Sequence, residues 1–222
     1  MARLARIVVP GAPHHVTQRG NRRQQTFFED ADYALYKQLL AEFCAEEKVA
    51  VWAYCLMPNH VHLILVPKRT ESLARAVGET HRRYSRHINF REGWRGFLWQ
   101  GRFASAPMDE PHLISAARYV ELNPVRARLV KTPEAWRWSS AAAHLAGRDD
   151  GLVSVAPLLE IVGGRGQWRK QLAHGLATEE VEAIRSAERT GRPLASPSFV
   201  KAIERRLGRP IAKRKPGPKP RG

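Results

Sequence analysis

Two histidines stand on either side of one apolar residue in the run His60-Val61-His62. Alternate side chains of a β-strand share a face, so the two imidazoles would point the same way while Val61 points to the other side. Two adjacent imidazoles can hold a metal ion, although so short a spacing also arises by chance. The apolar segment around them favours metal binding, because two histidines there would otherwise be costly to bury.

A tyrosine and an asparagine lie four residues apart, at Tyr119 and Asn123. On one helix they would share a face, and a phenol and an amide oxygen could then approach the same metal ion. The structural alternative is that Asn123-Pro124 ends one helix and starts the next, since a residue before proline avoids the α region and asparagine is a favoured N-cap. Residue types alone favour this structural interpretation, with Tyr119 as a half-buried core residue.

Arginines and aromatic rings are interleaved over residues 81–102. Arginines suit phosphates and rings suit stacked bases, which is the combination that single-stranded nucleic acid requires. The alternative is a solvated helix face beside core rings, and for Phe97 and Phe103 we expect the core. The candidate DNA-contacting residues, including three arginines after the first predicted strand, are Arg19, Arg22, Arg23, Arg82, Arg86, Gln100 and Arg102.

The composition points to a polyanionic partner inside the cell. Lys and Arg number 37 against 21 Asp and Glu, a net charge of +16, which exceeds what solubility requires of 222 residues. The two cysteines form no CxxC pair, and the apolar run at residues 7–9 is too short for a signal peptide. We therefore expect a cytoplasmic, nucleoid-associated protein with no membrane partner.

The elements that must position these residues follow a recognisable order. Residues 14–18, 49–56, 60–66 and an aromatic segment at 97–104 are predicted strands, and residues 30–48, 71–88 and a segment starting near 111 are predicted helices. Strands and helices thus alternate as β, α, β, β, α, β with a further helix. This order predicts an α+β fold, the ferredoxin-like βαββαβ sandwich with an extra helix that carries Tyr119.

The chain divides by pattern into three parts. Residues 1–130 carry the predicted sandwich, and residues 131–208 form a looser, partly helical C-terminal extension. Residues 209–222 hold six Lys or Arg and no acid, so they are predicted to be a disordered basic tail. Such a tail could clamp a DNA backbone loosely, although a solvated charge run is the commoner outcome.

Four motifs occur in an order that identifies a family. They are Pro13-His14-His15-Val16-Thr17-Gln18-Arg19-Gly20-Asn21, Met57-Pro58-Asn59-His60-Val61-His62-Leu63, Trp99-Gln100-Gly101-Arg102-Phe103 and Tyr119-Val120-Glu121-Leu122-Asn123-Pro124-Val125-Arg126-Ala127. From about residue 5 to 145 the chain resembles the REP-associated tyrosine transposases, which belong to the single-tyrosine HUH superfamily (two His around a hydrophobic residue). His14 departs from the pattern, since many relatives have tyrosine there.

The resemblance implies a site and a chemistry. His60 and His62 would be ligands of a divalent metal, Mg²⁺ or Mn²⁺, Tyr119 the nucleophile, and Asn123 the third ligand. Glu121 is a rival ligand that we rank lower, because two residues from Tyr119 it should face elsewhere on a helix. The implied activity is cleavage and rejoining of single-stranded or hairpin DNA at hairpin-forming repeats, through a 5′-phosphotyrosine.

Two other functions remain open at this point. A non-catalytic protein that binds structured DNA repeats would use the same fold and charge, and a metal phosphodiesterase would use water in place of Tyr119 as the nucleophile. The oligomeric state is open as well. A monomer is acceptable, since the tyrosine and the histidine pair occur in one chain.

Overall fold

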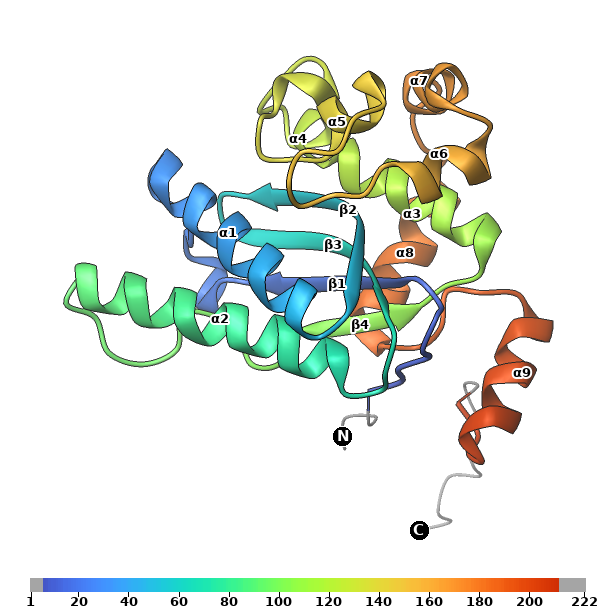
Figure 1. Ribbon diagram of the computed structural model, residues 1–222, viewed down its shortest axis with the longest axis horizontal. Helices are drawn as coiled ribbons and strands as arrows, with labels where there is room; N and C mark the ends of the chain where they lie inside the picture. Colours follow the sequence, from blue (N-terminus) through green and yellow to red (C-terminus); the bar gives the residue numbers. More distant parts are fainter. Residues whose placement is uncertain (1–5, 212–222) are drawn as a thin grey trace, which may run out of the picture.

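The computed structural model describes residues 6–211, and a four-stranded sheet lies at its centre (Figure 1). The regular elements are β1 (His14–Arg19), α1 (Asp30–Glu46), β2 (Val49–Met57), β3 (His60–Pro67), α2 (Ser72–Arg91), β4 (Ala104–Pro107), α3 (Glu110–Glu121), α4 (Asn123–Arg126), α5 (Ala141–Ala146), α6 (Ala156–Val162), α7 (Arg165–Ala173), α8 (Thr178–Thr190) and α9 (Pro197–Leu207), with short 3₁₀ turns at Asn21–Arg23 and Pro133–Ala135. None of the helices in this part of the chain is long and apolar enough to cross a membrane.

The sheet has the strand order β2-β3-β1-β4, and every neighbouring pair is antiparallel. Strands β1 and β3 are therefore central, and their register pairs Thr17 with His62 and Arg19 with His60. The predicted βαββαβ order and the ferredoxin-like fold class are confirmed. The predicted strand at residues 14–18, both strands around the Pro58-Asn59 turn and the first two helices lie within three residues of their observed bounds.

The two faces of the sheet are covered by different helices. On β3, Val61, Leu63 and Leu65 pack with α1 and α2 in one apolar cluster, while Ile64 packs with α3 and the helices that follow in a second cluster. Figure 1 shows α1 and α2 in front of the sheet and α8 behind it. Because strand side chains alternate, His62 shares the α3 and α8 face with Ile64.

The predicted aromatic strand at residues 97–104 is wrong, because β4 covers Ala104–Pro107. Gly96 and Gly101 take left-handed backbone angles, with φ of 100° and 65°, so the segment between them runs as a loop. Phe97 is 84% exposed on this loop, which corrects its expected place in the core, whereas Phe103 is buried as predicted. Trp99 reaches the core from the same loop.

The helices after residue 130 are packed directly on the rest of the molecule. Buried Trp168 and Ile184 belong to the same apolar cluster as Tyr119 of α3. Leu158 of α6 lies in this cluster too, and Figure 1 shows α8 behind the sheet. The domain boundary at residue 130 remains a prediction. Residues beyond it share an apolar core with the residues before it.

The ordered chain extends into the predicted basic tail. Ile211 is buried against Ile7, Val9 and Ile203, so its apolar side chain anchors a segment that was expected to be disordered from Arg209 onward. The backbone N–H of Ile211 also donates to the Glu204 carboxylate at 2.8 Å. The remainder of the predicted tail, residues 212–222, lies outside the described residues.

A buried carboxylate joins α3 to the extension. Glu121 is fully buried and accepts hydrogen bonds from Ser140 Oγ at 2.6 Å, His144 Nδ1 at 2.5 Å and Trp168 Nε1 at 2.9 Å. It therefore faces away from His60 and His62, as expected from its position two residues from Tyr119 on a helix. Because three donors depend on it, this carboxylate fixes the end of the helix that carries Tyr119.

We expect Glu121→Ala to lower the free energy of unfolding by about 3 kcal/mol, because it leaves three buried donors without an acceptor. The exposed Glu134 provides the control, and Glu134→Ala should change stability by less than about 0.5 kcal/mol. Urea denaturation at neutral pH measures both. Equal stability of the two variants would show that the buried network contributes nothing to the fold.

Candidate active site

The two histidines of the HUH motif lie side by side on β3. Their ring centroids are 5.0 Å apart, with His62 buried and His60 half-buried. The Nδ1 of His60 lies 2.6 Å from Asn59 Oδ1, an acceptor, so this ring nitrogen carries the proton and leaves Nε2 with a free lone pair. Both rings line the same cavity of about 450 Å³, which agrees with the prediction that they point to the same side of the strand.

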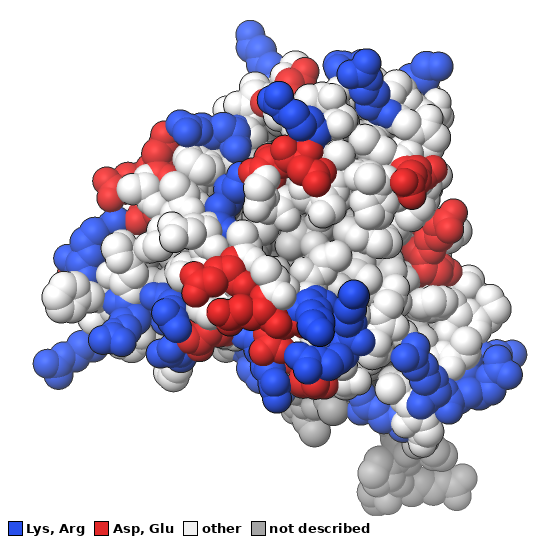
Figure 2. Space-filling view, viewed as in Figure 1, with Lys and Arg blue, Asp and Glu red and all other residues white. Residues whose placement is uncertain are grey.

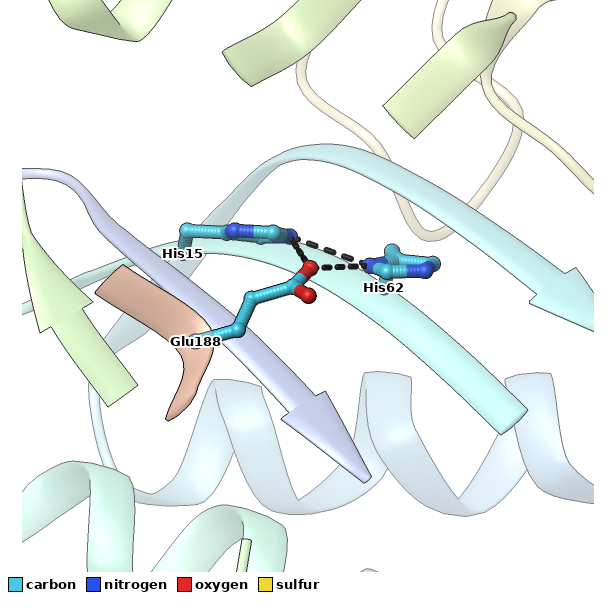
Figure 3. A group of neighbouring side chains, drawn as sticks. All are labelled: His15, His62 and Glu188. Atoms are coloured by element: carbon cyan, nitrogen blue, oxygen red, sulfur yellow. Dashed lines mark hydrogen bonds and ion pairs between the residues drawn. The ribbon is translucent and has the colours of Figure 1, made fainter. Parts of the chain in front are cut away.

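Two further side chains converge on His62 from other elements (Figure 3). The Nε2 of His15, on β1, lies 3.1 Å from His62 Nδ1. The Oε1 of Glu188, on α8, lies 3.5 Å from His62 Nδ1 and 3.8 Å from His15 Nε2. Among residues 6–211, these three side chains form a group whose donor atoms all lie within 4.8 Å of one another, close enough to share a metal ion.

The histidines at this site are uncharged at neutral pH. Burial lowers the pKa of His15 to about 4, and burial together with the nearby Arg19 lowers that of His60 to about 3. Burial also holds the pKa of His62 well below its usual value. Burial raises the pKa of Glu188 to about 7 against the opposing effect of several arginines. Neutral imidazoles keep the lone pairs that a metal ion requires.

Tyr119 lies on α3 with its ring nearly perpendicular to the rings of His15 and His62. Its ring centroid is 5.5 Å from that of His62 and 6.1 Å from that of His15, and only 5% of the residue is exposed. The guanidinium of Arg126, at the end of α4, lies 4.3 Å from the ring centroid. Arg185 of α8 is also close to Tyr119, and its interaction with this side chain raises the pKa of Arg185. The phenol is therefore held between two cations beside the histidine pair.

Asn123 does not continue the Tyr119 helix. Helix α3 ends at Glu121, and Asn123 is the first residue of α4, directly before Pro124. This is the structural alternative that the Asn-Pro pair suggested. Asn123 is buried, its Nδ2 has no hydrogen-bond partner, and among the described residues no hydrogen bond joins its side chain to His60 or His62. Its role as a ligand remains a prediction.

Five of the predicted DNA-contacting residues lie at the histidine site or its rim. The 450 Å³ cavity beside His60 and His62 is also lined by Arg19, Gln100, Arg102, Glu188 and Arg189. An adjoining cavity of about 640 Å³ is lined by Arg19, Arg22, Arg23, Gln100, Arg185, Glu188 and Arg189. The left-handed backbone of Arg22 and Arg23, with φ of 52° and 63°, is the kind of strain found at functional sites.

The other two predicted contacts lie on α2, over the opposite face of the sheet. Arg82 forms an ion pair with Glu79 at 2.6 Å, and Arg86 lines a separate cavity of about 580 Å³ with Phe90. Phe90 is 90% exposed. Figure 2 shows basic side chains gathered over the left end of α2. Neither Arg82 nor Arg86 lines the histidine cavity, but Arg82 shares a cavity of about 470 Å³ with Arg102, which borders both.

Three residues of the site escaped the sequence analysis, which did not assign a role to His15, Arg185 or Glu188. His15 shares a strand face with Thr17 and Arg19, but only the pairing of β1 with β3 brings it to His62. Arg185 and Glu188 lie more than 60 positions beyond Tyr119 on a helix with no recognisable motif. Only the packing of α8 against β1 and β4 places them here.

Comparison with known proteins gives one family and two solved structures. The family of IS200-like transposases matches residues 9–123. A REP-associated tyrosine transposase, solved bound to a REP hairpin, superposes with a TM-score of 0.58 at 19% identity and covers 69% of this chain and 92% of its own. At this identity the likeness shows the fold.

The second structure is a protein of Deinococcus radiodurans R1 assigned as a transposase. It has a TM-score of 0.38 at 22% identity and covers 54% of this chain and 96% of its own. No curated protein matches the chain. The family match ends at Asn123, so Arg185 and Glu188 lie outside it.

Proposed function

Because the chain belongs to the family of IS200-like transposases, we propose that it cleaves and rejoins single-stranded DNA by attack of Tyr119 on a phosphodiester. The observation that carries this proposal is the position of Tyr119, with its ring nearly perpendicular to that of His62 and between two arginines. The experiment that tests it is detection of a covalent protein–DNA adduct in the presence of Mn²⁺.

The donor set fits a divalent metal ion. The neutral imidazoles of His60 and His62 line one cavity with Glu188, and the His15 ring lies against His62. Glu188 Oε1 is buried without a hydrogen-bond partner, and such an oxygen is costly to leave unpaired. His60 and His62 would hold the ion, which would neutralise the charge that develops on the scissile phosphate. Mixed nitrogen and oxygen ligation suits Mn²⁺, and Mg²⁺ is the alternative ion in the cell.

The tyrosine step is a transesterification. The Tyr119 oxygen forms a bond to phosphorus, the bond from phosphorus to the 3′ oxygen breaks, and the leaving 3′ oxygen takes up a proton. The products are a 5′-phosphotyrosine on the protein and a free 3′-hydroxyl on the DNA. Because the bond energy is kept in the phosphotyrosine, a later 3′-hydroxyl can reseal the strand without ATP.

The cations around the cavity would position the phosphate. Arg126 and Arg185 hold the Tyr119 ring and hydroxyl, while Arg19, Arg102 and Arg189 line the walls where a DNA backbone would lie. The REP-associated transposase of similar fold was solved with a hairpin. We therefore propose single-stranded or hairpin-forming repeats as the substrate here as well.

We expect Arg102→Ala to weaken binding of hairpin DNA several-fold at low salt and to reduce the salt slope of log K by about one, because it removes one phosphate contact. Arg137, which pairs with Asp30 away from the site, is the matched control. Fluorescence anisotropy across a salt series measures both. An unchanged slope for Arg102→Ala would exclude it from the DNA interface.

A further inference from the structure

We propose that Glu188 is a metal ligand, so that helix α8 of the C-terminal extension completes the metal site. This inference rests on the proposed function, because it concerns the same divalent ion. The matched family region ends at Asn123 and assigns nothing to α8. The donor atoms that lie together belong to His15, His62 and Glu188, with His60 beside His62 on β3 at a ring-centroid distance of 5.0 Å. The carboxylate is supplied from outside the βαββαβ sandwich.

The donor atoms have the spacing that a shared metal ion requires. Around an ion with bonds of about 2.1 Å, neighbouring donors lie roughly 3.0 to 3.5 Å apart in octahedral or tetrahedral geometry. The three separations among His15 Nε2, His62 Nδ1 and Glu188 Oε1 are 3.1, 3.5 and 3.8 Å. One ion could therefore contact all three atoms with little movement, and Figure 3 shows the carboxylate directed at both rings.

One oxygen of the Glu188 carboxylate is left unsatisfied. Glu188 Oε1 is buried and makes no hydrogen bond. The nearest ring nitrogens, His62 Nδ1 at 3.5 Å and His15 Nε2 at 3.8 Å, lie beside this oxygen without a hydrogen bond to it. A buried carboxylate oxygen that makes no hydrogen bond is unfavourable, and a cation between it and the imidazoles removes that cost.

Helix α8 also carries cations next to Glu188. Arg185 and Arg189 flank Glu188 on α8, and Arg185 reaches Tyr119. The same helix therefore orders the nucleophile and one metal ligand. A divalent ion bound by one carboxylate and neutral imidazoles keeps a net positive charge, which can attract a phosphate. The carboxylate oxygen of Glu188 is a ligand that suits Mn²⁺ or Mg²⁺.

The test is isothermal titration calorimetry of the full chain with MnCl₂ in the absence of DNA. We expect Glu188→Gln to weaken Mn²⁺ affinity by at least about tenfold. The control is Glu179→Gln, the same change of charge at an exposed position of α8, which should leave the affinity unchanged. His62→Ala should lose binding, and Asn123→Ala should retain it.

A thermal melt gives an independent readout. Without metal, Glu188→Gln should melt at the same temperature as the parent chain or higher, because it removes an unpaired buried carboxylate. The rise in melting temperature that Mn²⁺ produces in the parent chain should be lost in this variant. A metal-free variant that melts far lower would instead assign Glu188 a structural role and overturn the proposal.

The outcomes separate this inference from the proposed function. If His62→Ala abolishes Mn²⁺ binding while Glu188→Gln binds as the parent does, Glu188 is not a ligand and the metal-dependent function stands. Loss of binding in Asn123→Ala with retention in Glu188→Gln would likewise overturn the inference and assign the third position to Asn123. If neither His62→Ala nor Glu188→Gln alters binding, the metal site itself is wrong.

Discussion

The Tyr119→Phe variant is expected to lose the covalent protein–DNA adduct completely while binding hairpin DNA within about twofold of the parent chain. Removal of the hydroxyl takes away the only atom of this residue that can bond to phosphorus. The ring keeps its contacts with Arg126 and His62, so the surrounding site should remain ordered. Denaturing electrophoresis measures the adduct, and anisotropy measures binding.

The matched control is Tyr36→Phe. Tyr36 lies on the opposite face of the sheet, where its hydroxyl pairs with His81 at 2.9 Å, and burial raises its pKa well above the usual value. This variant should still form the adduct. Adduct formation by Tyr119→Phe would reject Tyr119 as the nucleophile and direct attention to Tyr84 and Tyr36.

Combined replacement of His60 and His62 by alanine is expected to reduce DNA cleavage by about 10³-fold or more and to remove its response to added Mn²⁺. The two rings are the paired ligands of the proposed site, and no other residue on β3 can replace them. His174→Ala, at an exposed position beyond α7, should leave cleavage unchanged. Initial rates at several Mn²⁺ concentrations provide the measurement.

Persistent cleavage by the double histidine variant in excess chelator would contradict the metal-dependent chemistry. Loss of cleavage together with loss of DNA binding would also count against it, because these histidines are proposed to act on the phosphate after binding. The arginines at the rim should retain the DNA in the variant.

The sequence predicted the sheet well because its signals are local. Alternating apolar residues in β2 and β3 and the turn at Pro58-Asn59 specify two strands without reference to the rest of the chain. The same alternation placed His60 and His62 on one face. The strand prediction at residues 97–104 was wrong for a related reason. Trp99 and Phe103 lie in a loop but are buried, and buried residues of a loop follow no regular spacing in the sequence.

The rest of the site depends on contacts between distant elements. Glu188 is one of many charged residues on an amphipathic helix, and nothing in its neighbourhood distinguishes it from Glu179 or Glu182. Its burial follows only from the packing of α8 over β1, where Ile184 enters the apolar cluster that also holds Tyr119. Sequence patterns therefore identified the nucleophile and the histidine pair, and the fold supplied the groups around them.

The most direct test of the central claim is a denaturing gel of the protein with single-stranded hairpin DNA and Mn²⁺. DNA labelled at its 3′ end should appear as a band attached to the protein, and DNA labelled at its 5′ end should give a free shorter fragment with a 3′-hydroxyl. Both bands should be absent with Tyr119→Phe. Cleavage without an attached band would indicate water as the nucleophile, and intact DNA under every divalent metal would indicate a binding protein without this activity; either result contradicts the account.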